Sequence, residues 1–310
     1  MTALLKPHIV PSDAQVAVVS PASSPQPERV ERGFAALRAL GFAPQASEYL
    51  LARGPLYFAG KSEMRLSDLH HAFEDDQLRA IFATRGGYGS NMLLDELDLD
   101  LIAENAKPLI GFSDLTALQL WLLDQIHLPA FHGPMLSADF AREDGVHLAS
   151  LQAALGGKPY KVGAPEGLRP LHPGRARGTL YGGCLSILVS LLGTPFEPQT
   201  EGKLLFLEDV NVKPYQIDRM LWQLSEAGKL DGVRGIVFGE MLDCVSPGAP
   251  PELLNQAILR ALEDFTGPIA IGLRSGHVSR QNVTLTFGVE AELLVQKEAQ
   301  LQLIEPAVIA

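Results

Sequence analysis

The sequence has little cysteine, no long apolar run and no basic cluster, and each lack excludes a class of protein. Only Cys184 and Cys244 occur among 310 residues, without CxxC spacing. Neither a disulfide framework nor a thiolate metal site is therefore expected, and both thiols are predicted to be buried. The longest apolar stretch, near 185–192, falls short of the roughly 20 residues that span a bilayer. We expect no transmembrane helix and no membrane partner.

Positive charge is also scarce. The chain has 25 Lys and Arg against 36 Asp and Glu, a net charge of −11. Without a basic patch, nucleic acid is not an expected partner. The first ten residues lack the apolar core and small-residue cleavage site of a secretion signal, so we expect a cytoplasmic location.

The first half alternates strand-like and helix-like segments. Apolar runs predict strands at 16–19, 80–84 and 109–112. Apolar residues at helical spacing predict one helix across Val30–Leu40 and another that begins with Ser62 as N-cap and ends near Asp75. This alternation is typical of an α/β fold with a parallel sheet.

The middle of the chain contains many glycine and proline residues. Residues 151–177 are rich in both, and we interpret them as a linker between an N-terminal domain, 1–150, and a C-terminal domain, 178–310. The C-terminal part repeats the strand and helix pattern, so it is predicted to be a second α/β domain. Its expected strands are 204–207, 235–238 and 269–271, and its expected helices are 214–227, with Trp222 in the core, and 251–265.

Ser113 lies between a predicted strand and a predicted helix, in Gly111-Phe112-Ser113-Asp114-Leu115. This resembles the GxSxG nucleophile turn, with Leu115 in place of the last Gly. The Asp114 N–H would lie at a helix N-terminus, where it could stabilise an oxyanion. The pattern equally fits Ser113 as the N-cap of the helix.

Arg85-Gly86-Gly87-Tyr88-Gly89 follows another predicted strand, so it should lie at the edge of the sheet where ligands bind. Gly86 and Gly87 would let the backbone approach a substrate, and Arg85 could pair with a carboxylate. A tight structural turn is the alternative. A nucleotide-phosphate loop is disfavoured, because neither GxGxxG nor GxxxxGK[ST] is matched.

Two further loops carry acid and base candidates. A predicted strand ends in Glu208 and Asp209, either of which could support a histidine or simply be solvated. His277 follows another strand in a glycine-containing loop, and His is the usual general base near neutral pH. His132 also ends a probable strand, but HExxH is absent and no two histidines are spaced as His-x-His or i, i+4. We therefore expect no metal and no cofactor.

Together these segments resemble the LD-carboxypeptidase family of serine peptidases, which includes the microcin-C immunity peptidases. The resemblance covers nearly the whole chain, through Val18–Ala22, Arg85–Gly89, Ile110–Asp114, Phe131–Pro134, Leu205–Asp209 and Gly276-His277. The segment after His277 departs from the family pattern, because Asn282–Gly288 has no Pro.

The resemblance implies Ser113 as nucleophile, His277 as base and Glu208, rather than Asp209, as the acidic residue. It also implies oxyanion donors from the Asp114 N–H and the Gly86-Gly87 turn. The expected architecture is a flavodoxin-like parallel-sheet N-terminal domain with a smaller β-rich α/β C-terminal domain, as a homodimer.

The activity implied is release of the terminal D-Ala from a cytoplasmic murein tetrapeptide during peptidoglycan recycling, through an acyl-enzyme on Ser113. One alternative is an immunity-type peptidase that cleaves a peptidyl or aminoacyl nucleotide. Another is a two-domain protein that binds a small ligand without catalysis, which a covalent adduct at Ser113 would exclude.

Overall fold

The structure, a computed structural model, describes residues 3–250 and 252–310 of the chain. It divides into two units. The first comprises the chain up to Lys158 together with Arg280–Gly288 and Pro306–Ala310, and the second comprises Pro159–Ser279 and Val289–Glu305. Each unit combines helices with a sheet, which confirms the predicted α/β class.

The sheet of the first unit has six described strands in the order β12-β5-β4-β3-β1-β2. Strands β1 to β5 are parallel, whereas β12 is antiparallel to β5. The order 2-1-3-4-5 of the parallel strands is that of flavodoxin-like folds. The bounds are β1 Gln15–Val19, β2 Ala43–Ala46, β3 Leu78–Ala83, β4 Leu109–Gly111, β5 Ala130–His132 and β12 Leu285–Phe287.

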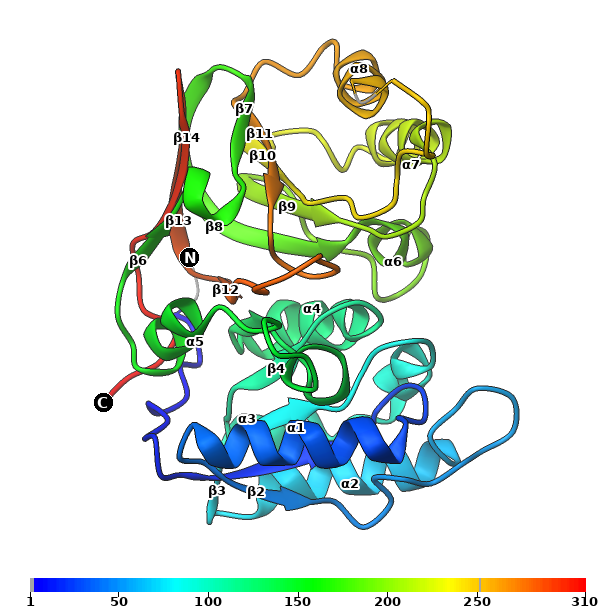
Figure 1. The fold of residues 1–310 in the computed structure, drawn as a ribbon, viewed down its shortest axis with the longest axis vertical. Helices are drawn as coiled ribbons and strands as arrows, with labels where there is room; N and C mark the ends of the chain where they lie inside the picture. The colour runs from blue at the N-terminus through cyan, green and yellow to red at the C-terminus, as the bar shows by residue number, and fades with distance from the viewer. Residues whose placement is uncertain (1–2, 251) are drawn as a thin grey trace. The chain divides into compact units, whose positions relative to one another are not determined.

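Helices cover both faces of this sheet, with α1 in front and α2 behind in Figure 1. Ser62 is the first residue of α2 rather than its N-cap, which is Lys61 and makes no side-chain cap bond. The predicted cap was therefore wrong by one residue. The helical segments are α1 Pro27–Ala39, α2 Ser62–Glu74, η1 Ser90–Glu96, α3 Leu99–Glu104, α4 Leu115–Ile126, η2 Leu136–Phe140 and α5 Leu148–Leu155.

The sheet of the second unit has eight described strands in the order β6-β14-β13-β8-β9-β10-β11-β7. The central strands β8 to β11 are parallel, and the outer strands are antiparallel to their neighbours. The bounds are β6 Tyr160–Val162, β7 Arg169–His172, β8 Gly174–Cys184, β9 Lys203–Glu208, β10 Gly235–Gly239, β11 Ile269–Leu273, β13 Glu290–Val295 and β14 Ala299–Leu303.

Residues 151–177, expected to link two domains, contain the end of α5, the strands β6 and β7, the short η3 Ala164–Glu166 and the start of β8. The helices of the second unit, α6 Leu185–Ser190, α7 Pro214–Glu226 and α8 Leu253–Ala261, lie together on one side of β9 and β10 in Figure 1. The predicted helix 251–265 is therefore shorter than expected, and Pro251 lies outside the described residues. No described helix is long and apolar enough to cross a bilayer.

Trp222 was predicted to lie in the core, and that prediction was wrong. Helix α7 buries Ile217, Leu221 and Leu224, whereas the Trp222 side chain is 58% exposed. Trp222 follows Ile217 by five residues, so it lies outside the i, i+4, i+7 stripe of Ile217, Leu221 and Leu224 that the helix buries. An indole in an amphipathic helix therefore does not by itself indicate burial.

Candidate active site

Ser113 occupies a strained turn between β4 and α4. Its φ angle is +66°, in the left-handed region that non-glycine residues rarely adopt. Such a conformation costs about 1–3 kcal/mol, and residues that adopt it cluster at active sites and ligand-binding loops. The Ser113 carbonyl accepts the Thr116 N–H at 2.9 Å, so the turn passes directly into α4. The serine is partly exposed while Phe112 and Asp114 are buried.

The Gly86-Gly87 turn packs directly against this serine. A Cβ atom at Gly86 would lie 2.7 Å from the Ser113 Cβ, 2.9 Å from its Oγ and 3.1 Å from the Asp114 nitrogen. Only glycine allows so close an approach. Gly87 has a φ of +107°, and a Cβ there would lie 2.4 Å from the Ser23 Oγ. The Gly86 backbone therefore lies close to both the Ser113 side chain and the Asp114 N–H at the start of α4.

The loop that follows β1 fixes this turn. The Ser23 hydroxyl accepts the Tyr88 N–H at 3.1 Å, and the Ser23 N–H donates to the Gly86 carbonyl at 3.3 Å. Ser23 was not among the residues predicted from the sequence, although it lies in the loop that follows the predicted strand 16–19. Arg85 is exposed beside the turn, where its guanidinium is accessible to a ligand.

Glu208 and His277 meet in the second unit. Glu208 is the last residue of β9 and is fully buried. Its Oε2 accepts two bonds from His277, one from the backbone N–H and one from Nδ1, each at 2.9 Å. With Glu208 ionised, Nδ1 carries the donated proton, which leaves the Nε2 lone pair able to accept another. The His277 side chain is 23% exposed.

Two glycines make room for the buried carboxylate. A Cβ at Gly276, where φ is +88°, would lie 2.4 Å from the Glu208 Cδ. A Cβ at Gly239, the last residue of β10, would lie 2.5 Å from the Glu208 Cβ. The glycines in these loops therefore determine where the carboxylate can lie, and Gly276 also determines the approach of the His277 backbone.

Asp209 has different partners from Glu208. Its carboxylate accepts the Ser186 N–H at 2.8 Å and its neighbour's N–H, from Val210, at 2.9 Å. Burial raises the pKa of the Asp209 carboxyl, and the backbone bonds from Val210 and Ser186 oppose that effect. Asp209 therefore anchors the start of α6, whereas Glu208 contacts the imidazole.

The two cysteines lie close to these acids, and both thiols are buried, as predicted. Burial raises the pKa of Cys184 well above its ordinary value and that of Cys244 to about 11, with smaller contributions from the nearby carboxylates. Neither thiol is ionised near neutral pH, so neither is an activated nucleophile.

The catalytic candidates thus form two groups. Ser113, Asp114, Gly86 and Gly87 come together in the first unit, whereas Glu208 and His277 pair in the second. His132 is fully buried at the end of β5, with its ring 5.3 Å from that of Phe287. The described residues contain no group of three or more potential metal ligands.

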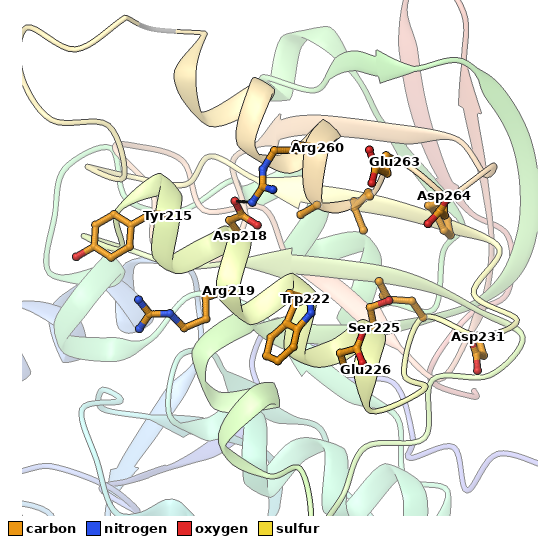
Figure 2. A pocket seen from close by; sticks show the side chains of 14 residues that line it. Tyr215, Asp218, Arg219, Trp222, Ser225, Glu226, Asp231, Arg260, Glu263 and Asp264 are labelled. Carbon is orange, nitrogen blue, oxygen red and sulfur yellow. Dashed lines mark hydrogen bonds and ion pairs between the residues drawn. The ribbon is translucent and has the colours of Figure 1, made fainter.

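A separate surface hollow of about 620 Å³ lies between α7 and α8. Figure 2 shows Tyr215, Arg219 and Trp222 along α7, with Arg260 of α8 paired to Asp218. Neither Glu208 nor His277 lines it. The exposed Trp222 indole lines this hollow, which does not include the Glu208–His277 pair.

Comparison with known protein families shows which family this chain belongs to. Residues 16–133 match the LD-carboxypeptidase N-terminal domain, and residues 177–293 match the LD-carboxypeptidase C-terminal domain. The chain belongs to the LD-carboxypeptidase family. This confirms the resemblance inferred from the six sequence blocks.

Named LD-carboxypeptidase relatives cover almost the whole chain. A Bacillus subtilis protein named "probable murein peptide carboxypeptidase" is 36% identical over 93% of this chain and 91% of its own length. The murein tetrapeptide carboxypeptidase of Pseudomonas aeruginosa is 33% identical over 91% of this chain and 94% of its own length. These relatives support a carboxypeptidase.

Solved structures of similar proteins share the fold. An MccF-like protein from Bacillus anthracis has a TM-score of 0.89 at 28% identity, over 98% of this chain and all of that one. The muramoyltetrapeptide carboxypeptidase from Oxalobacter formigenes has a TM-score of 0.82 at 27% identity, over 94% of this chain and all of that one. This two-unit LD-carboxypeptidase is therefore similar both to a murein peptidase and to an MccF-like protein.

Proposed function

We propose that this LD-carboxypeptidase is a serine peptidase that releases the terminal D-Ala from murein tetrapeptide. The observation that carries the proposal is the Glu208–His277 pair, because a buried carboxylate on Nδ1 leaves Nε2 to act as a base. The names of the Pseudomonas and Oxalobacter relatives support the substrate. A cytoplasmic location and a homodimer are part of the same proposal.

The reaction proceeds through an acyl-enzyme. His277 Nε2 takes the proton of the Ser113 hydroxyl as Oγ attacks the carbonyl of the diamino acid. The tetrahedral oxyanion is stabilised by the N–H of Asp114 and an N–H of the Gly86-Gly87 turn. His277 then protonates the leaving amine, so D-Ala departs and the acyl group stays on Oγ.

Water completes the cycle. His277 deprotonates a water molecule, the resulting hydroxide attacks the ester, and the Ser113 oxygen recovers its proton as the tripeptide leaves. Glu208 stabilises the imidazolium in both halves and keeps the ring in one tautomer. Arg85, exposed beside the turn, pairs with a carboxylate of the peptide.

The test compares Ser113→Ala with Ser67→Ala, which alters an exposed serine of α2 in the same unit. D-Ala release from the tetrapeptide is measured together with covalent labelling by a fluorophosphonate. We expect Ser113→Ala to lose label and to lower kcat by about 10⁴-fold or more, since a nucleophile acts as one unit with its base. Ser67→Ala should match the unchanged protein.

Two other outcomes have distinct meanings. Labelling without D-Ala release, together with cleavage of a peptidyl or aminoacyl nucleotide, would identify an immunity-type peptidase. Tight binding of peptide without labelling or turnover would identify a non-enzymatic binding protein. Undiminished D-Ala release by Ser113→Ala would refute the nucleophile assignment.

A further inference from the structure

Arg65 is a buried cation directly beneath the turn that packs on Ser113. It lies in the first turn of α2 and is 3% exposed. Its Nη1 donates to the Pro21 carbonyl at 2.8 Å and to the Gly89 carbonyl at 2.7 Å. Its Nη2 donates to the Ser62 hydroxyl at 3.1 Å. One guanidinium therefore connects the loop after β1 to the loop after β3.

The loop is shaped to accept this side chain. Gly89 has a φ of +127°, and a Cβ there would lie 2.7 Å from the Arg65 Nη1 and 2.7 Å from the Phe58 ring. The guanidinium also lies over the Phe58 ring, 5.2 Å from its centroid. A buried charge is costly unless it is hydrogen-bonded, and here two backbone carbonyls and the Ser62 hydroxyl accept from Nη1 and Nη2, whereas the buried Nε has no hydrogen-bond partner among the described residues. The buried guanidinium contacts the last residue of the Arg85–Gly89 segment, Gly89.

The next residue connects the same loop to the nucleophile. The Ser90 N–H donates to the Asp114 Oδ2 at 2.8 Å, and the Ser90 hydroxyl donates to the Asp114 carbonyl at 2.5 Å. Both residues are buried. Asp114 follows Ser113 directly, so the bonds run from Arg65 through Gly89 and Ser90 to the residue whose N–H is the proposed oxyanion donor.

We propose that Arg65 and Ser90 are positioning residues that hold the two halves of the oxyanion hole at a fixed separation. One half is the Gly86-Gly87 turn, and the other is the Asp114 N–H. Arg65 fixes the far end of the turn, and Ser90 ties that end to Asp114. This inference rests on the proposed function, because it assumes that both backbone groups stabilise the same oxyanion.

The proposal predicts a particular kinetic signature. Donors in an oxyanion hole act most strongly on the charge that develops in the transition state, so a small displacement lowers kcat more than it raises KM. We expect Arg65→Met to lower kcat about 100-fold and Ser90→Ala about 10-fold, with KM changing by no more than about twofold. Arg65→Lys should lie between Arg65→Met and the unchanged protein, because an ammonium keeps the charge but loses the planar fork.

Asp68→Asn is the matched control. Asp68 is one turn further along α2, is also buried, and holds the loop after β2 through the Ser47 hydroxyl and the Tyr49 N–H. Its loss should affect the melting temperature without the selective fall in kcat. A purely structural role of Arg65 would make the two positions behave alike.

The experiment measures kcat and KM for D-Ala release, the rate of labelling by a fluorophosphonate, and the melting temperature of each full-length variant. Labelling needs the nucleophile and oxyanion hole but no peptide, so it tests the inference independently of the substrate. Active wild-type protein with unchanged kcat and labelling in folded Ser90→Ala and Arg65→Lys overturns the inference alone. Wild-type protein that neither labels nor releases D-Ala overturns the proposed function and the inference with it.

Discussion

The Ser113 turn of the first unit and the Glu208–His277 pair of the second hold their reactive groups by different means. Ser113 is positioned by backbone, through a left-handed φ and a glycine turn packed against it. Glu208 and His277 are positioned by side-chain hydrogen bonds, in space that Gly276 and Gly239 leave open. The turn at Ser113 is held in a strained backbone conformation, whereas the Glu208–His277 pair depends on the space left by the missing side chains of Gly276 and Gly239. Substitutions should therefore affect the two in opposite ways.

The largest effect should come from placing a methyl group in the space beside Glu208 in the second unit. In Gly276→Ala the new methyl group would overlap the Glu208 Cδ, and the residue would also need an unfavourable φ of +88°. We expect at least a 100-fold loss of activity and a loss of stability of about 2–4 kcal/mol. Kinetics and denaturant unfolding would measure both.

Gly193→Ala provides the control for this substitution. Gly193 has a φ of +73° in the same unit, but a Cβ there meets nothing within 4 Å. Its substitution should cost about 1 kcal/mol through the backbone alone and leave activity intact. If both alanine variants lose the same stability and keep their activity, clearance around Glu208 is not what positions the pair.

A smaller effect, of opposite sign, should follow from releasing the strain in the first unit. Ser113→Gly removes the proposed nucleophile and permits φ of +66°, whereas Ser113→Ala removes the hydroxyl and keeps the strain. We expect both variants to be inactive and the glycine variant to be more stable by about 1 kcal/mol. Thermal unfolding of the two variants side by side measures the difference.

Ser67→Gly is the control for the effect of glycine on stability, which is ordinarily destabilising in a helix. In the exposed interior of α2, Ser67→Gly should be less stable than Ser67→Ala by about 1 kcal/mol. A Ser113→Gly protein that is less stable than Ser113→Ala would show that the turn at Ser113 is not strained.

The smallest effect concerns a histidine that acts on stability rather than catalysis. The His70 Nε2 accepts the Asp98 N–H at 3.0 Å, which requires a neutral ring. Burial lowers the pKa of His70, and the nearby Asp98 and Glu74 oppose this. As pH falls, the unfolded chain therefore binds a proton at His70 before the folded chain does.

The pH dependence of stability follows from that sign. The contribution of His70 is fully present above its unfolded pKa and is lost as pH falls towards its lower folded pKa. In His70→Gln this part of the decline should vanish, while D-Ala release near neutral pH stays unchanged. Melting temperatures from pH 8 to 5 for both proteins measure it, and parallel curves would contradict the prediction.

Much of the fold can be read from local pattern, because buried parallel strands appear as short apolar runs. The runs at 16–19 and 204–207 lie within β1 and β9, whose residues are almost wholly buried. Helix α7 begins at Pro214 as predicted. The limits of α8 and the exposure of Trp222 were predicted wrongly, since helical periodicity alone does not say which apolar side chains a neighbour covers.

The local sequence pattern did not indicate that Arg65 and Ser90 contact the loops of the candidate site. Arg65 occurs among charged residues of an amphipathic helix, where an arginine is ordinarily exposed. Only the packing of α2 under two loops buries it. Ser90 likewise lies in a short segment without recognisable periodicity, and its bonds to Asp114 join residues 24 positions apart.

The sequence by itself determined the buried parallel strands β1, β3, β4, β9, β10 and β11, the longer helices, and the loops after strands that carry Ser113, Glu208 and His277, because buried strands and turns have characteristic local residue patterns. The local pattern left Glu208 and Asp209 open and the family resemblance implied Glu208; the tertiary structure shows that Glu208 contacts His277. Only the tertiary structure decided that Gly86 packs on Ser113 and that Arg65 is buried. Adjacent acids at a strand end point to opposite faces, and which face meets the imidazole depends on loops 69 residues away.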